Sequence, residues 1–104
     1  MEKTMMRNVE TYQELMFAIQ GHACVVKFEA AWCQPCKTMS QPFGLAASRN
    51  PNVLAIVVDI EQVREAGTSC GVRAVPTFQR WEHGTLTRER TGMLSPGELD
   101  ELFA

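Results

Sequence analysis

Two cysteines three positions apart, in the segment Trp-Cys-Gln-Pro-Cys at residues 32–36, constrain the fold of this chain more than any other feature. Residues 24–28, just before them, are apolar apart from Lys27 and include two β-branched side chains, which predicts a buried strand. Residues 36–49 predict a helix, and Pro42 is expected to kink it because an interior proline removes a backbone hydrogen bond. The pair is therefore predicted to lie where a buried strand passes into a helix.

This position favours redox chemistry of the two thiols. The first N–H groups of a helix are unpaired and carry partial positive charge, so a sulfur held there is more easily deprotonated. Pro35 suits the first helical turn, where its missing N–H costs nothing. We interpret Cys33 as an exposed nucleophile and Cys36, one turn further along, as the resolving thiol.

Zinc sites use the same cysteine spacing, which makes a metal site the competing interpretation. A structural zinc ion takes four ligands. The remaining candidates, Cys24, Cys70, His22 and His83, are isolated in the sequence. We therefore predict no metal site and no bound cofactor, because the sulfur pair itself carries the electrons.

The rest of the chain predicts an α/β fold. Apolar spacing, turn residues and a capping box that begins at Ser95 indicate further helices and strands. The helices are expected at residues 10–20, 61–70 and from 95 onward, and the strands at 53–59, 77–81 and 86–91. The predicted order is β-α-β-α-β-α-β-β-α, and its first strand is not assigned to particular residues. This order implies a mixed sheet flanked by helices on both faces.

Length and charge exclude several other classes of protein. At 104 residues with a net charge of −2, the chain predicts a single domain, residues 1–104, with its own core. Lysine and arginine are scattered, which argues against nucleic acid as a partner. The longest apolar run, Val53–Val58, is too short to span a membrane. Four cysteines fit a reducing compartment, and without a signal-peptide pattern we expect a cytoplasmic protein.

Several segments at matching spacing make the chain resemble the thioredoxin family over nearly its whole length. Residues 25–28 followed by Trp-Cys-Gln-Pro-Cys-Lys at 32–37 resemble the family's strand and Trp-Cys-Gly-Pro-Cys-Lys motif, and Val75-Pro76-Thr77 resembles its cis-proline signature. Further matches are Pro42, the strand end Val57-Val58-Asp59-Ile60 and the turn at residues 91–95. The resemblance implies a thioredoxin fold, reduction of disulfide-containing proteins, and a monomer recharged by a thioredoxin-reductase-type donor.

The resemblance also implies a role for each matched residue. Cys33 would attack a target disulfide to give a mixed disulfide, and Cys36 would then attack Cys33 and release the reduced target. Pro76, in cis, would lie beside the cysteines, where its neighbour's backbone pairs with an extended substrate. Four residues would form a shallow apolar docking surface around the nucleophile: Trp32, Gly71, Val75 and Gly92.

Lys27 is the most consequential departure from the family pattern. The family usually has a buried aspartate here, which helps to take the proton from the resolving thiol. Strand alternation places Lys27 and Glu29 on one face, about 7 Å apart along the backbone. Three interpretations stay open: a charged Lys27 that stabilises the Cys36 thiolate and raises the reduction potential, a partly neutral Lys27 that serves as the base, or a solvent-seeking lysine paired with Glu29.

Two further positions bear on the redox site. Gln34 replaces the family's glycine between the cysteines. Cys24 is expected to be a small core residue, whereas Cys70 is a possible regulatory thiol because it precedes Gly71 near the expected docking surface. The residues expected to tune the redox chemistry are Trp32, Gln34, Pro35 and Lys27.

These observations support a protein-disulfide reductase that cycles Cys33 and Cys36 between dithiol and disulfide. The alternative is a thioredoxin-fold binding module, or an oxidase- or isomerase-like protein with a re-poised redox site. Thioredoxin folds also serve as clamps or subunits without turnover.

Overall fold

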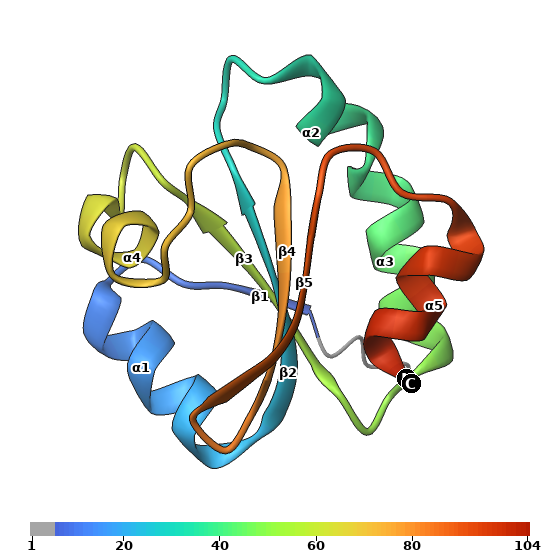
Figure 1. Cartoon of the computed structure of the whole chain (residues 1–104), viewed down its shortest axis with the longest axis horizontal. Helices are drawn as coiled ribbons and strands as arrows, with labels where there is room; N and C mark the ends of the chain where they lie inside the picture. The colour runs from blue at the N-terminus through green and yellow to red at the C-terminus, as the bar shows by residue number, and fades with distance from the viewer. Residues whose placement is uncertain (1–5) are drawn as a thin grey trace.

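The computed structural model describes residues 6–104, and a five-stranded sheet runs through its centre (Figure 1). The strands lie in the order β1-β3-β2-β4-β5. Along the chain the elements are β1 (Met6–Asn8), α1 (Tyr12–Gly21), β2 (Ala23–Glu29), α2 (Gln34–Thr38), α3 (Ser40–Arg49), β3 (Leu54–Asp59), α4 (Arg64–Ser69), β4 (Thr77–Glu82), β5 (Thr85–Thr91) and α5 (Pro96–Phe103).

The sheet is mixed, as the sequence predicts. β1 and β2 both pair with β3 in parallel, whereas β4 pairs antiparallel with β2 and β5 pairs antiparallel with β4. The final hairpin turns at His83 and Gly84, both of which have positive φ. Among the described residues no helix is long and apolar enough to cross a membrane.

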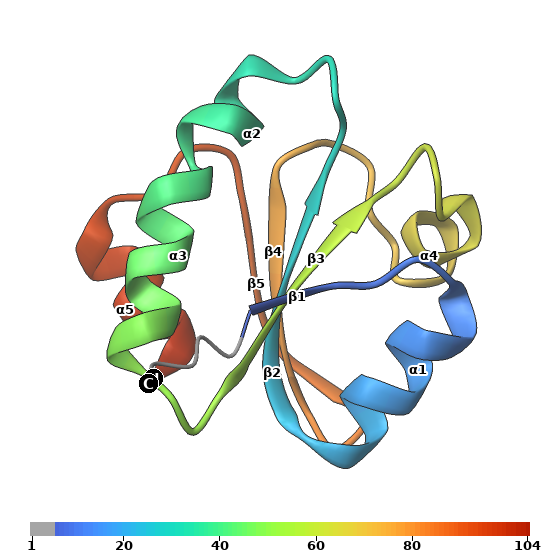
Figure 2. The same ribbon diagram turned by 180° about the vertical axis from the view of Figure 1, so that it is seen from behind.

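Helices cover both faces of the sheet and close two separate cores. Figures 1 and 2 show α1 and α4 on one face and α3 and α5 on the other, with α2 at one end. The first core contains Leu15, Ile19, Val26 and Phe28, and the second contains Phe43, Phe78 and Phe103. β2 is the central strand and contributes side chains to both cores, so packing on both faces positions the strand that leads to the cysteines.

The prediction of a single helix over residues 36–49 is wrong, because the structure has two helices there, α2 and α3. The break lies at Met39 rather than at Pro42. A proline ring clashes with the carbonyl of the residue four positions earlier and leaves it without a hydrogen-bond donor. For Pro42 that residue is Thr38, the last residue of α2, so the interruption comes one turn before the proline.

The helix predicted over residues 61–70 begins later than expected, at Arg64. The side chain of Asp59 accepts hydrogen bonds from the N–H groups of Glu61 at 2.8 Å and Gln62 at 3.3 Å. Such an Asx-type turn competes with the helix for those N–H groups. The other predicted elements are confirmed within about two residues at their ends, including the capping box at Ser95.

Candidate active site

The two cysteines lie at the point where β2 passes into α2, as the sequence predicts. They form a disulfide with a Cα–Cα distance of 5.3 Å. Cys33 is the N-cap of α2, and its Sγ accepts a hydrogen bond from the Cys36 N–H at 3.1 Å. Pro35 occupies the first turn, where no N–H is needed. The start of the helix therefore directs an N–H that has no partner within the helix, and the partial positive charge it carries, at the sulfur of Cys33.

Cys33 is not exposed in this disulfide form, contrary to expectation. Only 3% of its surface is accessible, against 2% for Cys36. The two residues form a small apolar cluster with Ala30, against which Ile60 and Val75 pack. Ile60 comes from the loop after β3 and Val75 from the loop before β4. The resemblance placed Val75 beside the cysteines, whereas no sequence signal placed Ile60 there.

Trp32 stands at the rim of this cluster. Its side chain is 66% exposed, and its indole Nε1 donates a hydrogen bond to Glu61 Oε2 at 2.7 Å. The bond joins the β2–α2 connection to the turn before α4 and fixes the plane of the indole. Glu61 comes from a distant turn, so no local sequence pattern predicts this contact.

The Val75–Pro76 peptide is cis, as the resemblance implies. Val75 packs against the cysteine cluster, and the Pro76 carbonyl accepts the Gly92 N–H at 2.9 Å. Three of the four expected docking residues, Trp32, Val75 and Gly92, thus belong to or adjoin segments beside the disulfide. Gly71 is exposed, with φ of 75°, at the start of the loop that leads from α4 to this peptide.

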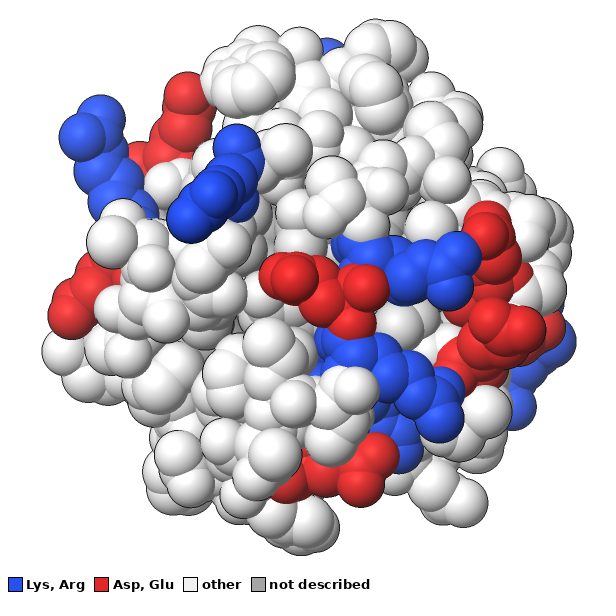
Figure 3. Space-filling model, in the orientation of Figure 1, with Lys and Arg blue, Asp and Glu red and all other residues white. Residues whose placement is uncertain are grey.

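Charge is unevenly distributed over the face seen in Figure 3. Charged side chains gather over β5 and α5 and again around α4, whereas the region over α2 is largely uncharged. Gln34 and Pro35 are both exposed there. An apolar rim around a disulfide suits the docking of another polypeptide better than that of a small charged molecule.

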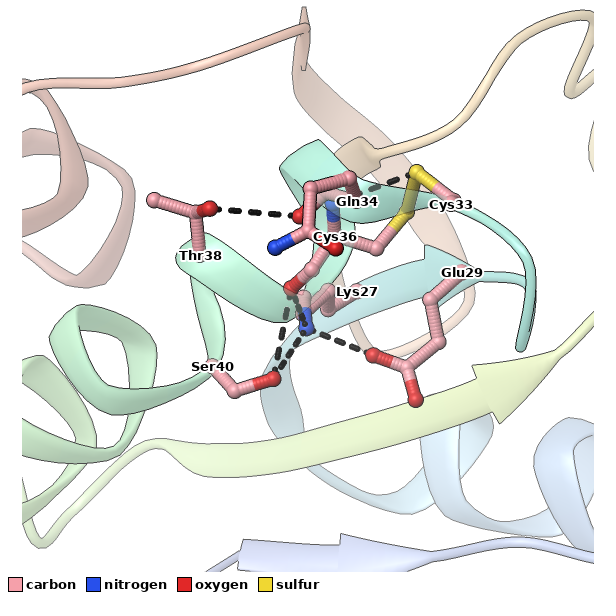
Figure 4. A network of polar contacts seen from close by, with 7 residues as sticks. All are labelled: Lys27, Glu29, Cys33, Gln34, Cys36, Thr38 and Ser40. Atoms are coloured by element: carbon pink, nitrogen blue, oxygen red, sulfur yellow. Dashed lines mark hydrogen bonds and ion pairs between the residues drawn. A yellow bond between two sulfur atoms is a disulfide. The ribbon is translucent and has the colours of Figure 1, made fainter.

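Lys27 lies beneath the cysteines and is buried, with 1% of its surface exposed, so the interpretation of a solvent-seeking lysine is wrong. β2 is covered on both faces, so the lysine side chain is enclosed except where it lines a small pocket with Glu29 and Ser40. The expected pairing with Glu29 is confirmed, with 2.5 Å between Lys27 Nζ and Glu29 Oε1. Nζ also donates to the Cys36 carbonyl at 2.9 Å and to Ser40 Oγ at 3.2 Å (Figure 4).

Ser40 is a polar member of this site that sequence reasoning missed. Its hydroxyl donates to the Cys36 carbonyl at 3.2 Å, so Ser40 and Lys27 converge on the same oxygen. Its position four residues after Cys36 could have predicted this contact, because a serine in a helix often donates a hydrogen bond to the carbonyl one turn earlier.

The remaining two cysteines are free and buried. Burial raises the pKa of Cys24 to about 12, with a smaller opposing effect of Arg80, and raises the pKa of Cys70 to about 11. Cys24 is a core residue, as predicted. Within residues 6–104, no group of three or more histidine, cysteine, aspartate or glutamate side chains is arranged to hold a metal ion.

Known proteins are similar to this chain in both sequence and architecture. The Thioredoxin family model matches residues 3–103. Thioredoxin domain-containing protein 8 of Rattus norvegicus is 32% identical over 77 residues, which cover 74% of this chain and 61% of that protein. Thioredoxin of Homo sapiens is 31% identical over 91 residues, which cover 85% of this chain and 87% of that protein.

A solved structure of a thioredoxin has a similar fold. The crystal structure of thioredoxin from Trypanosoma brucei brucei is similar with a TM-score of 0.85 and 28% identity, covering 91% of this chain and 84% of that chain. The cysteine pair at the helix N-terminus, the cis-proline and the mixed sheet are therefore found in a chain that belongs to the thioredoxin family of thiol–disulfide oxidoreductases, which act on protein disulfides.

Proposed function

We propose that this protein reduces disulfides in other proteins, with Cys33 as the attacking thiol and Cys36 as the resolving thiol. The observation that carries the proposal is the position of Cys33 at the N-cap of α2, where the Cys36 N–H points at its sulfur. A donor aimed at a sulfur stabilises the thiolate, and the thiolate is the species that attacks a disulfide.

The reaction takes two exchanges. The Cys33 thiolate bonds to one sulfur of the target disulfide, and the other target sulfur leaves as a thiolate that takes a proton from water. Cys36 then loses its proton and attacks Cys33 Sγ, which breaks the bond to the target. Two electrons pass to the target, whose sulfurs both end as thiols, and the Cys33–Cys36 disulfide of the structure is the oxidised product.

Trp32, Val75 and Gly92 are proposed to form the docking surface, with Gly71 at its edge and the backbone beside Pro76 pairing with an extended target segment. The exposed indole, the contact of Val75 with the cysteine cluster and the sparse charge over α2 support this assignment (Figure 3). Gln34 and Pro35 cover the disulfide from the solvent side and are expected to influence which targets fit.

Family members are reduced by thioredoxin reductase, and we propose a donor of this type for this protein, which then works as a monomeric electron carrier in the cytoplasm. The free thiols of Cys24 and Cys70 fit a reducing compartment. Coupling the oxidised protein to a thioredoxin reductase and NADPH would test the donor, and fractionation of the source cells would test the compartment.

Dithiothreitol-driven reduction of insulin tests the function. We expect the wild-type protein to accelerate it and Cys33→Ser to abolish the acceleration. Cys70→Ala is the matched control, because it removes a thiol that lies outside the active site, and it should retain at least half of the activity. Acceleration that survives in Cys33→Ser would overturn the proposal.

A further inference from the structure

The site contains a buried charge that the two exchanges do not use. Lys27 is the most deeply buried charged side chain among the described residues. A charge removed from water costs free energy unless other groups compensate for it. The partners of Lys27 therefore show what its charge acts on.

The hydrogen bonds of Lys27 match the donors of an ammonium group. The Ser40 hydroxyl uses its only hydrogen on the Cys36 carbonyl, so it accepts from Nζ rather than donating to it. The Cys36 carbonyl and the Glu29 carboxylate also accept from Nζ. Three acceptors match the three N–H donors of an ammonium group, whereas a neutral amine has two. This pattern disfavours the interpretation of Lys27 as a neutral base.

The ion pair has a direction. Its positive member is buried and contacts Cys36 directly, whereas its negative member, Glu29, is 29% exposed and partly screened by water. Figure 4 shows the ammonium group between the peptide of Cys36 and the carboxylate of Glu29. The positive end thus contacts the peptide of the resolving cysteine, and the countercharge is partly exposed to solvent.

We propose that Lys27 is an electrostatic positioning residue for the resolving step: its charge stabilises the Cys36 thiolate as it forms, its hydrogen bond holds the Cys36 peptide, and Glu29 offsets part of that charge. The inference rests on the proposed function. In the mixed disulfide, Cys36 gives its proton to water, its thiolate bonds to Cys33 Sγ, and the target sulfur leaves with the electron pair of the broken bond. A nearby positive charge favours the charged form of the attacking thiol.

The two members of the ion pair are predicted to have opposite effects on this step. Lys27→Met removes the stabilising charge and should slow the attack by Cys36 about tenfold. Glu29→Gln removes the offsetting charge while leaving an acceptor for Nζ, and it should accelerate the same attack. A role limited to supporting the fold would instead make both substitutions harmful.

The probe is the small disulfide 5,5′-dithiobis(2-nitrobenzoate), applied to the reduced protein in a Cys70→Ala background. Attack by Cys33 releases one coloured thiolate, and attack by Cys36 on the mixed disulfide releases a second, so stopped-flow absorbance resolves the two steps. Lys27→Met should leave the first release within twofold of the parent rate and slow the second. Lys27→Gln, which keeps a donor but no charge, should behave in the same way and provides a second uncharged variant.

Thr38→Ala is the matched control, because it removes a neutral side-chain hydrogen bond to the Gln34 carbonyl in the same helix and touches neither member of the ion pair. It should change the second release less than twofold. The inference is overturned if Lys27→Met and Glu29→Gln shift the second release in the same direction, if neither shifts it, or if Thr38→Ala slows it as much as Lys27→Met.

Failure of the proposed function would look different, since the parent protein would then show no first release that depends on Cys33.

The redox equilibrium of the Cys33–Cys36 pair offers an independent readout. At a pH where Cys36 of the reduced protein is ionised, a tenfold loss of thiolate stabilisation in Lys27→Met should lower the reduction potential by about 30 mV in titrations against dithiothreitol, because a more stable reduced form means a higher potential.

Discussion

At the scale of single residues, the ion pair beneath the cysteines makes its two members unequal for stability. Lys27→Met removes a buried charge and leaves a carboxylate that water already reaches, so we expect the free energy of unfolding to change by less than about 1 kcal/mol. Glu29→Ala leaves the buried ammonium group without its countercharge and should cost about 2 kcal/mol. Urea unfolding of the oxidised proteins measures both values, and equal losses would contradict this account.

The thiol of Cys70 is predicted to react slowly despite its position before the docking loop. Burial raises its pKa to about 11, so at pH 8 roughly one molecule in a thousand carries a thiolate. Iodoacetamide at pH 8 should therefore modify neither Cys70 nor Cys24 in the oxidised, folded protein, and both after unfolding in urea. Mass mapping that finds Cys70 modified in the folded protein as fast as a small-molecule thiol would restore it as a regulatory candidate.

At the scale of the elements, the cap of α5 is expected to contribute to stability without affecting the chemistry. Ser95 Oγ accepts the Glu98 N–H at 3.1 Å, and Glu98 Oε1 accepts the Ser95 N–H at 2.8 Å. Ser95→Ala should cost about 1 kcal/mol of unfolding free energy, with insulin reduction unchanged. Ser48→Ala, an exposed position inside α3, is the control and should cost less than half as much.

Local sequence signals predicted the elements well and their junctions less well. The capping box at Ser95 and the helix start at the CxxC motif each depend on interactions between residues that are close in the sequence. A local sequence pattern is therefore enough to predict them. The break at Met39 depends on a clash between Pro42 and a carbonyl one turn away, which shifts it from the residue that causes it. The late start of α4 depends on whether the Asp59 side chain accepts hydrogen bonds from the backbone N–H groups that follow it. The spacing of apolar residues does not indicate that.

Within the redox site, too, features with a local sequence signal were predicted, and features that depend on tertiary packing were not. The sequence motif identified Cys33, Cys36 and the cis-proline, because each has a local signature. The burial of Cys33 and the contact between Trp32 and Glu61 depend on loops that tertiary packing brings together. Alternation along β2 predicted that Lys27 meets Glu29, but coverage of both sheet faces by helices determines that the lysine stays buried.

At the scale of the whole molecule, the two free thiols predict a loss of stability at alkaline pH. Burial raises the pKa of Cys24 from 9.0 to about 12 and that of Cys70 to about 11, because the folded protein disfavours both thiolates. The folded state thus keeps these protons at pH values where the unfolded state has lost them. Their contribution to stability is complete below pH 9 and decreases as the pH rises toward 11 and 12.

Urea unfolding at pH 8 and pH 10 measures this effect. A Cys33→Ser/Cys36→Ser background keeps the redox thiols from contributing, and Cys24→Ala in that background should show a shallower decrease than its parent. A parent protein whose stability is as high at pH 10 as at pH 8, or identical slopes in the two proteins, would show that these thiols are not held protonated by burial.

The most direct test of the central claim is to trap the intermediate. Reduced Cys36→Ser cannot resolve a mixed disulfide, so after incubation with insulin it should accumulate a covalent adduct. Peptide mass mapping should place that adduct on Cys33, and dithiothreitol should release it. An adduct on Cys70 or Cys24, or no adduct from a protein that still accelerates insulin reduction, would contradict the assignment of Cys33 as the attacking thiol.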